Sequence, residues 1–263
     1  MAILDQIVAN KRKEVDQSKE LYPVKLLEKS AFYSTPTVSL KHYLTRPGSS
    51  GVIAEIKRKS PSKGDINPYV SVESLSIAYM QAGAAGLSIL TDKKFFGGTN
   101  DDVISARKTN FCPILRKEFV IDEYQVIEAK SIGADVILLI ARILDAQKLK
   151  SLATLAKGLG LEVLCEVHEA SELEKALIEE VTHVGINSRN LDTLEIDIGA
   201  FEKLAAMIPA DKIRIAESGI SDPQVLKKLR TDGFTGFLIG ENFMKSADPA
   251  KACARFIQDA QGA

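Results

Sequence analysis

Short runs rich in β-branched residues alternate with amphipathic helical segments along most of the chain, at a spacing of roughly 20–30 residues that is typical of repeated βα units. Eight strands are expected, over residues 52–57, 84–90, 112–116, 134–140, 161–167, 182–187, 212–217 and 234–240. Helical patterns are expected at about 71–82, 101–109, 122–131, 145–157, 169–178, 199–207, 221–230 and 249–259. This alternation predicts an α/β fold, a (β/α)8 barrel of the TIM type.

The region before the first expected strand carries a helical pattern of its own. Ile3, Leu4, Ile7 and Val8 form an apolar stripe there. We therefore expect one domain over residues 1–263, with residues 1–48 as a helical extension packed on the barrel. A doubly wound open sheet is the alternative, but it usually has fewer strands and a Gly-rich first turn, which is missing here.

Composition limits the classes of partner and the compartment. With 263 residues, 45% hydrophobic, the chain can bury a full core. A net charge of -1 gives no global electrostatic reason to expect nucleic acid or an anionic membrane as a partner. No signal peptide or membrane-spanning apolar stretch is recognisable, so we expect a cytoplasmic protein. Cys112, Cys165 and Cys253 lack metal-binding spacing and are expected to be buried.

The first expected strand carries charge although its composition predicts burial. Alternation along residues 52–57 places Glu55 and Lys57 on one face, together with Ile53. A buried ion is strongly destabilising unless it is paired, so this face is expected to hold something polar. An edge strand with one solvated face is the alternative interpretation.

Charged and polar residues also end several other expected strands, and in such a barrel the carboxyl ends of the strands carry the chemistry. The residues at these ends are Glu55, Lys57, Arg116, Lys117, Glu118, Phe119, Glu166, Asn187, Arg189, Glu217 and Ser218. Two lysines and three of the glutamates, Glu55, Glu166 and Glu217, can supply general acids and bases whose pKa values are set by mutual pairing. No metal cluster is expected, and the three histidines fall outside these ends or just past them.

Two regions suit an anionic ligand such as phosphate. The loop at residues 59–64 is rich in hydroxyl groups and positive charge. Gly219 and Gly240 follow the last two expected strands, where backbone N–H groups can approach a phosphate closely.

In these regions the chain resembles the indole-3-glycerol phosphate synthase family. The similar segments are residues 55–64, 90–98, 115–122, 166–168, 185–191, 217–220 and 238–241. They occur in order over nearly the whole chain. The chain departs from the family pattern at Glu118, where Asp is expected, at Ser188, where Asn is common, and at Gly97–Gly98, where one Gly is usual. None of these departures removes an acid, a base or a phosphate contact.

The resemblance implies a carboxy-lyase of tryptophan biosynthesis, an aromatic amino acid pathway. Such an enzyme converts 1-(2-carboxyphenylamino)-1-deoxyribulose 5-phosphate into indole-3-glycerol phosphate by ring closure, decarboxylation and dehydration. The implied partner is this phosphorylated small molecule, with no redox or metal cofactor, nucleic acid or membrane. Contact with other enzymes of the pathway and the oligomeric state stay open.

The resemblance also implies roles for the charged residues. Lys117 is expected to be the general acid that protonates the ketone oxygen during ring closure, and Glu166 the base in dehydration. Lys57 either binds the substrate carboxylate or acts as a second acid. Arg189 either meets the substrate carboxylate or bridges loops.

The remaining residues are expected to support the charged ones or to bind substrate. Two glutamates hold the lysines in place and charged, and two neutral residues supply hydrogen bonds: Glu55 and Glu217, and Asn187 and Ser218. The residues expected at the phosphate are Lys59, Ser60, Gly219 and Gly240. The residues expected around the aromatic ring are Phe95, Phe119, Leu138, Leu194 and Leu238.

Two rival functions make different demands on the same residues. An isomerase of a related ribulose phosphate would keep Gly219 and Gly240 but would not need both Lys57 and Lys117. A catalytically silent barrel acting as a scaffold would lack at least one of Lys57, Lys117 and Glu166. All three are present.

Overall fold

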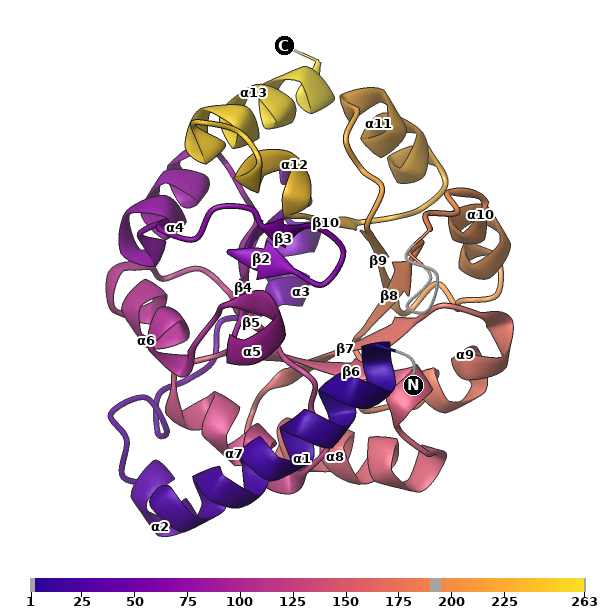
Figure 1. The fold of residues 1–263 in the computed structure, drawn as a ribbon. Helices are drawn as coiled ribbons and strands as arrows, with labels where there is room; N and C mark the ends of the chain where they lie inside the picture. Colours follow the sequence, from indigo (N-terminus) through magenta and orange to yellow (C-terminus); the bar gives the residue numbers. More distant parts are fainter. Residues whose placement is uncertain (1–2, 190–194, 263) are drawn as a thin grey trace.

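Eight parallel strands close into a barrel in the computed structural model, which describes residues 3–189 and 195–262 (Figure 1). The barrel strands are β1 (Val52–Ile56), β4 (Gly86–Leu90), β5 (Ile114–Lys117), β6 (Val136–Ile140), β7 (Glu162–Val167), β8 (His183–Asn187), β9 (Ile213–Glu217) and β10 (Gly236–Ile239). Neighbours along the chain pair in parallel, and β10 pairs with β1. The predicted (β/α)8 barrel is confirmed, whereas the open sheet is excluded.

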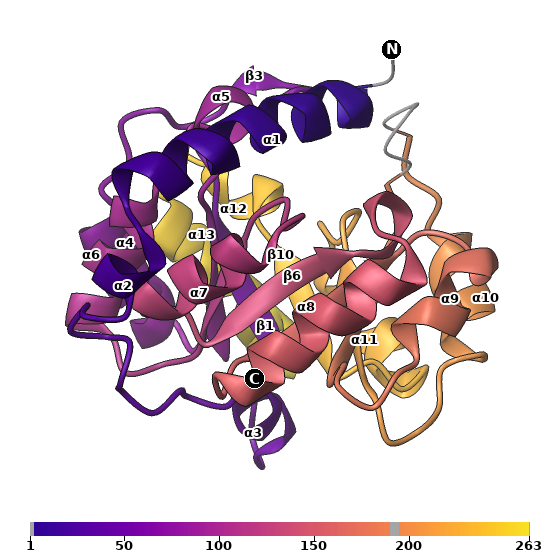
Figure 2. The ribbon, with the colours of Figure 1, turned by 90° about the horizontal axis from the view of Figure 1, so that it is seen from below.

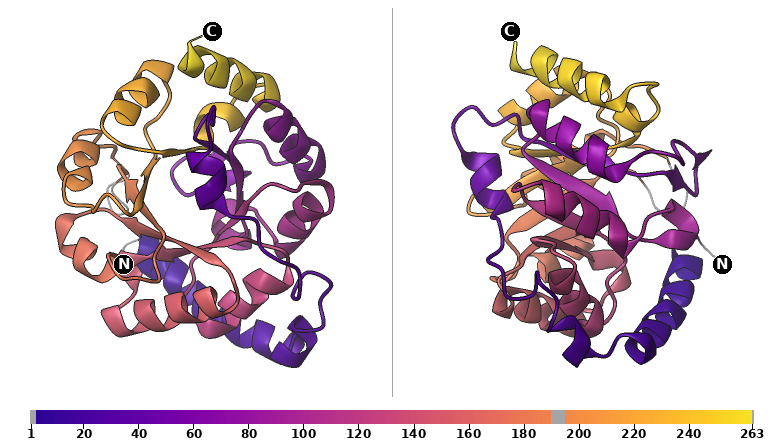
Figure 3. Two further views of the ribbon diagram at one scale, coloured as in Figure 1. Left: turned by 180° about the vertical axis from the view of Figure 1, so that it is seen from behind. Right: turned by 90° about the vertical axis from the view of Figure 1, so that its left-hand side faces the viewer.

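A helix follows each barrel strand and packs on the outside of the barrel (Figure 3). These helices are α4 (Val72–Gln81), α6 (Asn100–Thr109), α7 (Glu123–Ser131), α8 (Ala146–Gly158), α9 (Ala170–Ala176), α10 (Gly199–Ala205), α11 (Pro223–Thr231) and α13 (Pro249–Gln261). Most begin where the sequence predicts, because a Ser or Asp side chain accepts the first free backbone N–H groups. These caps are Ser71, Asp122, Asp145, Asp222 and Asp248.

The region before β1 contains α1 (Ile3–Leu21), α2 (Val24–Leu27) and α3 (Leu40–Thr45). Figure 2 shows α1 lying across one end of the barrel and α3 at the other end. Leu40 and Leu44 of α3 join the core cluster inside the barrel, near the strands' amino ends. The two ends are therefore covered by different parts of the same N-terminal region.

Short elements at the carboxyl ends of the strands were not predicted. They are the antiparallel pair β2 (Lys59–Ser60) and β3 (Gly64–Asp65), the helices α5 (Lys93–Phe96) and α12 (Glu241–Met244), and the 3-10 turn η1 (Ala141–Ile143). Each is at most four residues long, which is too short for a periodic pattern to reveal. Residues 59–64 were expected to be a loop, and they instead belong to a hairpin whose turn is at residues 61–63.

The side chains of β1 alternate between two apolar layers, as the sequence predicts. Val52, Ala54 and Ile56 belong to the cluster between strands and helices, whereas Ile53 belongs to the cluster inside the barrel. Since β1 lies between β4 and β10, the edge-strand interpretation is wrong. The interior is apolar toward the amino ends and becomes charged toward the carboxyl ends, which places the site.

Candidate active site

A cavity of about 160 Å³ opens at the carboxyl ends of the strands, and we call it the mouth cavity. Every barrel strand contributes to its wall. In chain order the strand residues are Glu55, Leu90, Lys117, Leu138, Ile140, Glu166, Asn187, Glu217 and Leu238. Lys57, Glu118, Phe119, Arg189, Ser218 and Glu241 follow strand ends and line it as well. The convergence predicted from the strand ends is therefore present for all of them except Arg116, which is not among the lining residues and instead donates to Glu128 Oε2.

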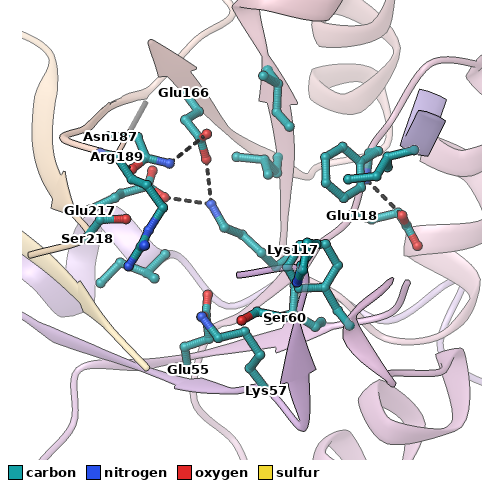
Figure 4. Close-up of a pocket in the computed structure, with 18 of the residues that line it drawn as sticks. Glu55, Lys57, Ser60, Lys117, Glu118, Glu166, Asn187, Arg189, Glu217 and Ser218 are labelled. Atoms are coloured by element: carbon teal, nitrogen blue, oxygen red, sulfur yellow. Dashed lines mark hydrogen bonds and ion pairs between the residues drawn. The ribbon is translucent and has the colours of Figure 1, made fainter. Parts of the chain in front are cut away.

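Lys117 is the centre of the charged cluster (Figure 4). Its Nζ donates one hydrogen bond to Glu166 Oε2 and one to Glu217 Oε2, each 2.6 Å long. Burial by itself would lower the pKa of Lys117, but the charges of Glu166, Glu217 and Glu55 outweigh burial and raise it. The amine is thus held as an ammonium ion that faces the cavity.

The two carboxylates on Lys117 differ in proton affinity. Burial would raise the pKa of Glu166, but Lys117, His168 and the amide of Asn187 outweigh it and lower the pKa to about 2. Asn187 Nδ2 donates to Glu166 Oε1 at 3.0 Å. Burial and the charge of Glu166 raise the pKa of Glu217 to about 7, despite Lys117. Glu166 is therefore the ionised member of the pair, and Glu217 is the one that takes up a proton near neutral pH.

Lys57 has a carboxylate of its own. Its Nζ lies 3.0 Å from Glu55 Oε1, and both side chains line the mouth cavity. The charged face of β1 was expected to hold something polar. Within the protein, that polar feature is the ion pair of Lys57 and Glu55. Lys57 and Lys117 enter the cavity from different strands and are held by different glutamates.

Two glycines make room for these buried carboxylates. A Cβ atom on Gly185 would collide with Glu217 Oε1, and one on Gly240 would lie 2.6 Å from Glu55 Oε1. Gly240 therefore has a packing role, and its contact with phosphate stays a prediction. Gly185 was part of a recognised motif, but a strand glycine gives no signal in sequence about which side chain needs its space.

Aromatic and aliphatic side chains form the apolar part of the cavity wall. Phe119, Leu138 and Leu238 line it, as expected. Phe95 is not among the lining residues, and the adjacent Phe96 is, with its ring centroid 5.8 Å from that of Phe119. The one-turn helix α5, which the sequence did not reveal, decides which of the two phenylalanines faces the cavity. The predicted Leu194 lies outside the described residues.

Helix α1 completes the apolar wall from the N-terminal region. Ile3, Leu4 and Ile7 line the mouth cavity. These residues belong to the apolar stripe recognised in the sequence, which predicted that the segment packs on the barrel. The N-terminal region thus contributes directly to the site.

The residues predicted at the phosphate are only partly brought together. Ser60 lines the cavity, and so does Ser62, whereas Lys59, Gly219 and Gly240 are not among the lining residues. Ser218 lines the cavity with φ of +68°, the one positive φ outside glycine in the described part of the chain. Such a conformation is strained and clusters at functional sites.

Arg189 bridges two loops at the rim. Its Nη2 lies 3.3 Å from Glu241 Oε2 at the start of α12, and its backbone N–H donates to Asn187 Oδ1. Of the two alternatives given by the sequence, the structure contains the bridge. Contact with the substrate carboxylate stays a prediction.

Two charged residues near the cavity were missed. His168 directly follows β7 and is two positions after Glu166, and its Nε2 lies 3.4 Å from Glu166 Oε1. That spacing was a usable signal. Lys11 of α1 is buried, with Nζ 2.9 Å from Glu118 Oε1 and 3.0 Å from Asp92 Oδ2. Its position four residues after Ile7, on the apolar stripe, was the corresponding signal.

Two other kinds of site are absent from residues 3–189 and 195–262. No group of three or more His, Cys, Asp or Glu side chains there could hold a metal ion. No helix there has the length and apolar character needed to cross a membrane. Cys112, Cys165 and Cys253 are free and buried, as expected.

Comparison with known proteins identifies close relatives. The family model described as indole-3-glycerol phosphate synthase matches residues 4–256. The chain is 46% identical over 259 residues to an indole-3-glycerol phosphate synthase of Bacteroides thetaiotaomicron, covering 98% of this chain and 99% of the relative. It is 44% identical to the enzyme of that name from Caldanaerobacter subterraneus, covering 92% and 93% of the two chains.

A solved structure supports the fold independently. A mutant tryptophan synthase alpha-subunit from Pyrococcus furiosus superposes with a TM-score of 0.61, covering 82% of this chain and 99% of that chain. The sequence identity is 15%, so the likeness concerns the barrel and not the reaction.

Proposed function

The chain belongs to the indole-3-glycerol phosphate synthase family, and on that premise we propose how its mouth cavity catalyses the family reaction. The substrate is 1-(2-carboxyphenylamino)-1-deoxyribulose 5-phosphate, and the products are indole-3-glycerol phosphate, carbon dioxide and water. The enzyme is a carboxy-lyase of tryptophan biosynthesis. The observation that carries the assignment of roles is the buried Lys117 ammonium between Glu166 and Glu217, facing the cavity.

Ring closure forms a bond between the aromatic carbon that bears the carboxylate and the ketone carbon of the substrate. The electron pair of the C=O bond moves to oxygen, and we assign Lys117 as the acid that protonates this oxygen. The raised pKa of Lys117 does not oppose the step, because an alkoxide is itself strongly basic. Loss of carbon dioxide then restores the aromatic ring.

Donation by Lys117 prepares the next step. While Lys117 is an ammonium ion, it lowers the pKa of Glu166 and makes this carboxylate a weak base. Once Lys117 has given up its proton, the positive charge 2.6 Å from Glu166 Oε2 is gone, and the proton affinity of Glu166 rises. Glu166 thus becomes a competent base only after the ring has closed.

Dehydration removes a proton from the methylene carbon next to nitrogen and the new hydroxyl group from the neighbouring carbon. Glu166 takes the proton. Lys57, whose Nζ lies 3.0 Å from Glu55 Oε1, protonates the departing hydroxyl or binds the substrate carboxylate before it is lost. Asn187 and Ser218 supply neutral hydrogen bonds at the same end of the barrel.

The substrate's two ends are assigned to different parts of the cavity. The aromatic ring packs among the apolar residues, which are Phe96, Phe119, Leu138, Leu238 and the α1 residues Ile3, Leu4 and Ile7. The phosphate is assigned to the hairpin β2–β3 and to the turns after β9 and β10, where Lys59, Ser60, Gly219 and Gly240 lie.

We also propose that residues 1–263 form one domain in which residues 1–48 are an extension of the barrel. The basis is that α1 lines the mouth cavity while α3 fills the opposite end. A cytoplasmic location and contacts with other enzymes of the tryptophan pathway remain proposals that follow from the family.

The reaction is tested by adding the carboxyphenylamino substrate to the purified protein and following indole fluorescence. We expect product from the parent chain and about 10²–10⁴-fold less from Glu166→Gln. A folded parent chain that formed no indole product would contradict the proposed function. A Glu166→Gln variant as fast as the parent would contradict only the assignment of the base.

A further inference from the structure

The imidazole of His168 lies between two carboxylates, and one of them is the proposed base. Nε2 is 3.4 Å from Glu166 Oε1, and Nδ1 is 3.7 Å from Glu172 Oε2. The His168 side chain is only 6% exposed. Both ring nitrogens are closed to solvent, and neither has a hydrogen-bond partner in the described part of the chain. This is a buried polar group whose arrangement needs an explanation.

The two contacts suit the protonated ring. A neutral imidazole has one N–H donor and one acceptor, so one nitrogen would face a carboxylate lone pair to lone pair. An imidazolium ion donates from both nitrogens, one toward each glutamate. Burial lowers the pKa of His168, but Glu172, Glu166 and Glu217 outweigh burial and raise it above its ordinary value.

Glu172 is itself fixed, so it can anchor the ring. It belongs to α9, four residues after His168, and its Oε2 accepts the backbone N–H of His168 at 2.7 Å. Burial would raise the pKa of Glu172, but the interactions with the side chain and the backbone N–H of His168 outweigh burial and lower it. The charged groups that act on the imidazole are thus Glu166 on β7, Glu172 on α9 and Glu217 on β9, with Lys117 beyond Glu166.

Glu166 needs such a partner most when Lys117 has lost its proton. Lys117 holds Oε2 of Glu166 and Asn187 holds Oε1, and the ammonium is the stronger of these two partners. After proton donation, the His168 ring still lies 3.4 Å from Glu166 Oε1, and contacts that are long in the free enzyme tighten in the reacting complex.

We propose that His168 is a positioning residue for the reaction: its ring, anchored by Glu172, keeps the Glu166 carboxylate oriented for proton uptake. The inference rests on the proposed role of Glu166 as base. It adds a second carboxylate, Glu172, that acts on the reaction only through His168.

The chain offers a matched control in His183. This residue is fully buried, and its Nε2 also lies 3.4 Å from a glutamate oxygen, Glu162 Oε2. It lies at the amino end of β8, away from the mouth cavity. Burial outweighs Glu162 and lowers its pKa to about 4, so its pKa is shifted in the opposite direction from that of His168.

Kinetics of four variants test the proposal. His168→Leu should lower kcat about tenfold and leave KM within about twofold, because the substrate contacts remain. His168→Asn should lose about as much, because its neutral amide takes the place of Nδ1 beside Glu172 and leaves no donor in the place of Nε2 beside Glu166. His183→Asn should leave kcat and its pH dependence unchanged. Glu172→Gln keeps an acceptor for the backbone N–H of His168 and removes only the anchoring charge.

The pH profile separates positioning from general structural damage. The parent kcat should fall as His168 loses its proton, at a pH above the ordinary histidine value of 6.5. This falling limb should move to lower pH in Glu172→Gln and vanish in His168→Asn. Because the chain has three histidines, NMR titration of the imidazole signals gives the same midpoint without any turnover.

Three results would overturn the proposal. They are a kcat within twofold of the parent in His168→Leu, an unchanged His168 midpoint in Glu172→Gln, and a loss in His183→Asn equal to that in His168→Asn. If His168→Leu does not fold, the asparagine variant and the titration still decide. If the parent chain formed no indole product, that result would instead contradict the proposed function.

Discussion

Lys117 and Lys11 are both buried lysines held by carboxylates, and their difference separates a catalytic cluster from a structural one. Lys117 lies between Glu166 and Glu217 and faces the mouth cavity. Lys11 lies behind the wall of that cavity, between Asp92 and Glu118, and fastens α1 to the barrel. Figure 4 shows the Glu118 carboxylate pointing away from the Lys117 ammonium.

The two clusters also differ in how well their charges are balanced. At Glu118, burial would raise the pKa, but the positive charges of Lys11 and Arg116 outweigh burial and lower it. At Glu217, burial and repulsion from Glu166 outweigh the attraction of Lys117, and the pKa is raised to about 7. A raised lysine pKa is common to both sites and does not identify the catalyst. The catalytic cluster is identified by Glu217, whose charge is not balanced, and by the open mouth cavity.

Removing the amine of Lys117 should give the largest effect on the reaction. We expect Lys117→Ala to lower kcat by about 10²–10⁴-fold, because no other described ammonium lies between Glu166 and Glu217 to protonate the ketone oxygen. Stability should change far less, since Glu217 can take up a proton when Lys117 is gone. Single-turnover kinetics and thermal unfolding of the same preparation check this. A kcat within a few-fold of the parent would remove Lys117 as the acid.

The same substitution at Lys11 should act on stability. Lys11→Ala leaves Asp92 and Glu118 buried without the Lys11 ammonium. Removing one partner of a buried ion pair typically lowers the free energy of unfolding by about 3–5 kcal/mol. We expect kcat to fall less than tenfold, through looser seating of α1. Urea unfolding combined with kinetics at saturating substrate is the measurement. A loss of rate as large as that of Lys117→Ala, without a loss of stability, would erase the distinction between the clusters.

A pair of glutamine substitutions sharpens the comparison through pH. The folded pKa of Glu217 is above its ordinary 4.5, so its contribution to stability is full below pH 4.5 and is lost as the pH rises through about 7. Glu217→Gln should therefore gain melting temperature relative to the parent between pH 5 and pH 8, by a few degrees, at roughly 2–4 °C per kcal/mol.

Glu118→Gln should show the opposite sign. The folded pKa of Glu118 is below 4.5, so its contribution is present above pH 4.5 and is lost as the pH falls through the folded value. The variant should melt below the parent at pH 8, and the gap should close toward acid pH. Equal pH dependence in the two glutamine variants would show that the clusters are electrostatically alike.

The smallest effect is expected from the helix that joins the clusters. Ile7 of α1 lines the mouth cavity, whereas Val15 of the same helix is equally buried but does not. Ile7→Ala should raise KM a few-fold, because the wall around the aromatic ring is lost, and should also lower stability by about 2–5 kcal/mol. Val15→Ala should lower stability alone. Steady-state kinetics of the two variants check this, and equal KM values would show that α1 is only structural.

The sequence by itself determined the barrel and most of its chemistry. Eight strands and eight main helices follow from hydrophobic periodicity and capping residues, which act over a few neighbouring positions and therefore can be read locally. Glu55, Lys117, Glu166 and Glu217 were recognisable because charged residues stood at the ends of apolar strands, where only function explains them. The family resemblance then assigned their roles.

The tertiary structure alone decided how these groups pair. Contacts between strands far apart in the chain decide which glutamates hold Lys117 and which one holds Lys57. They also decide which phenylalanine faces the cavity and which glycine makes room for Glu217. The raised pKa of Glu217 and the lowered pKa of Glu166 arise from the same source. Desolvation and charge pairing act through space over a few ångströms, so residues distant in sequence set them, and no local pattern records the result.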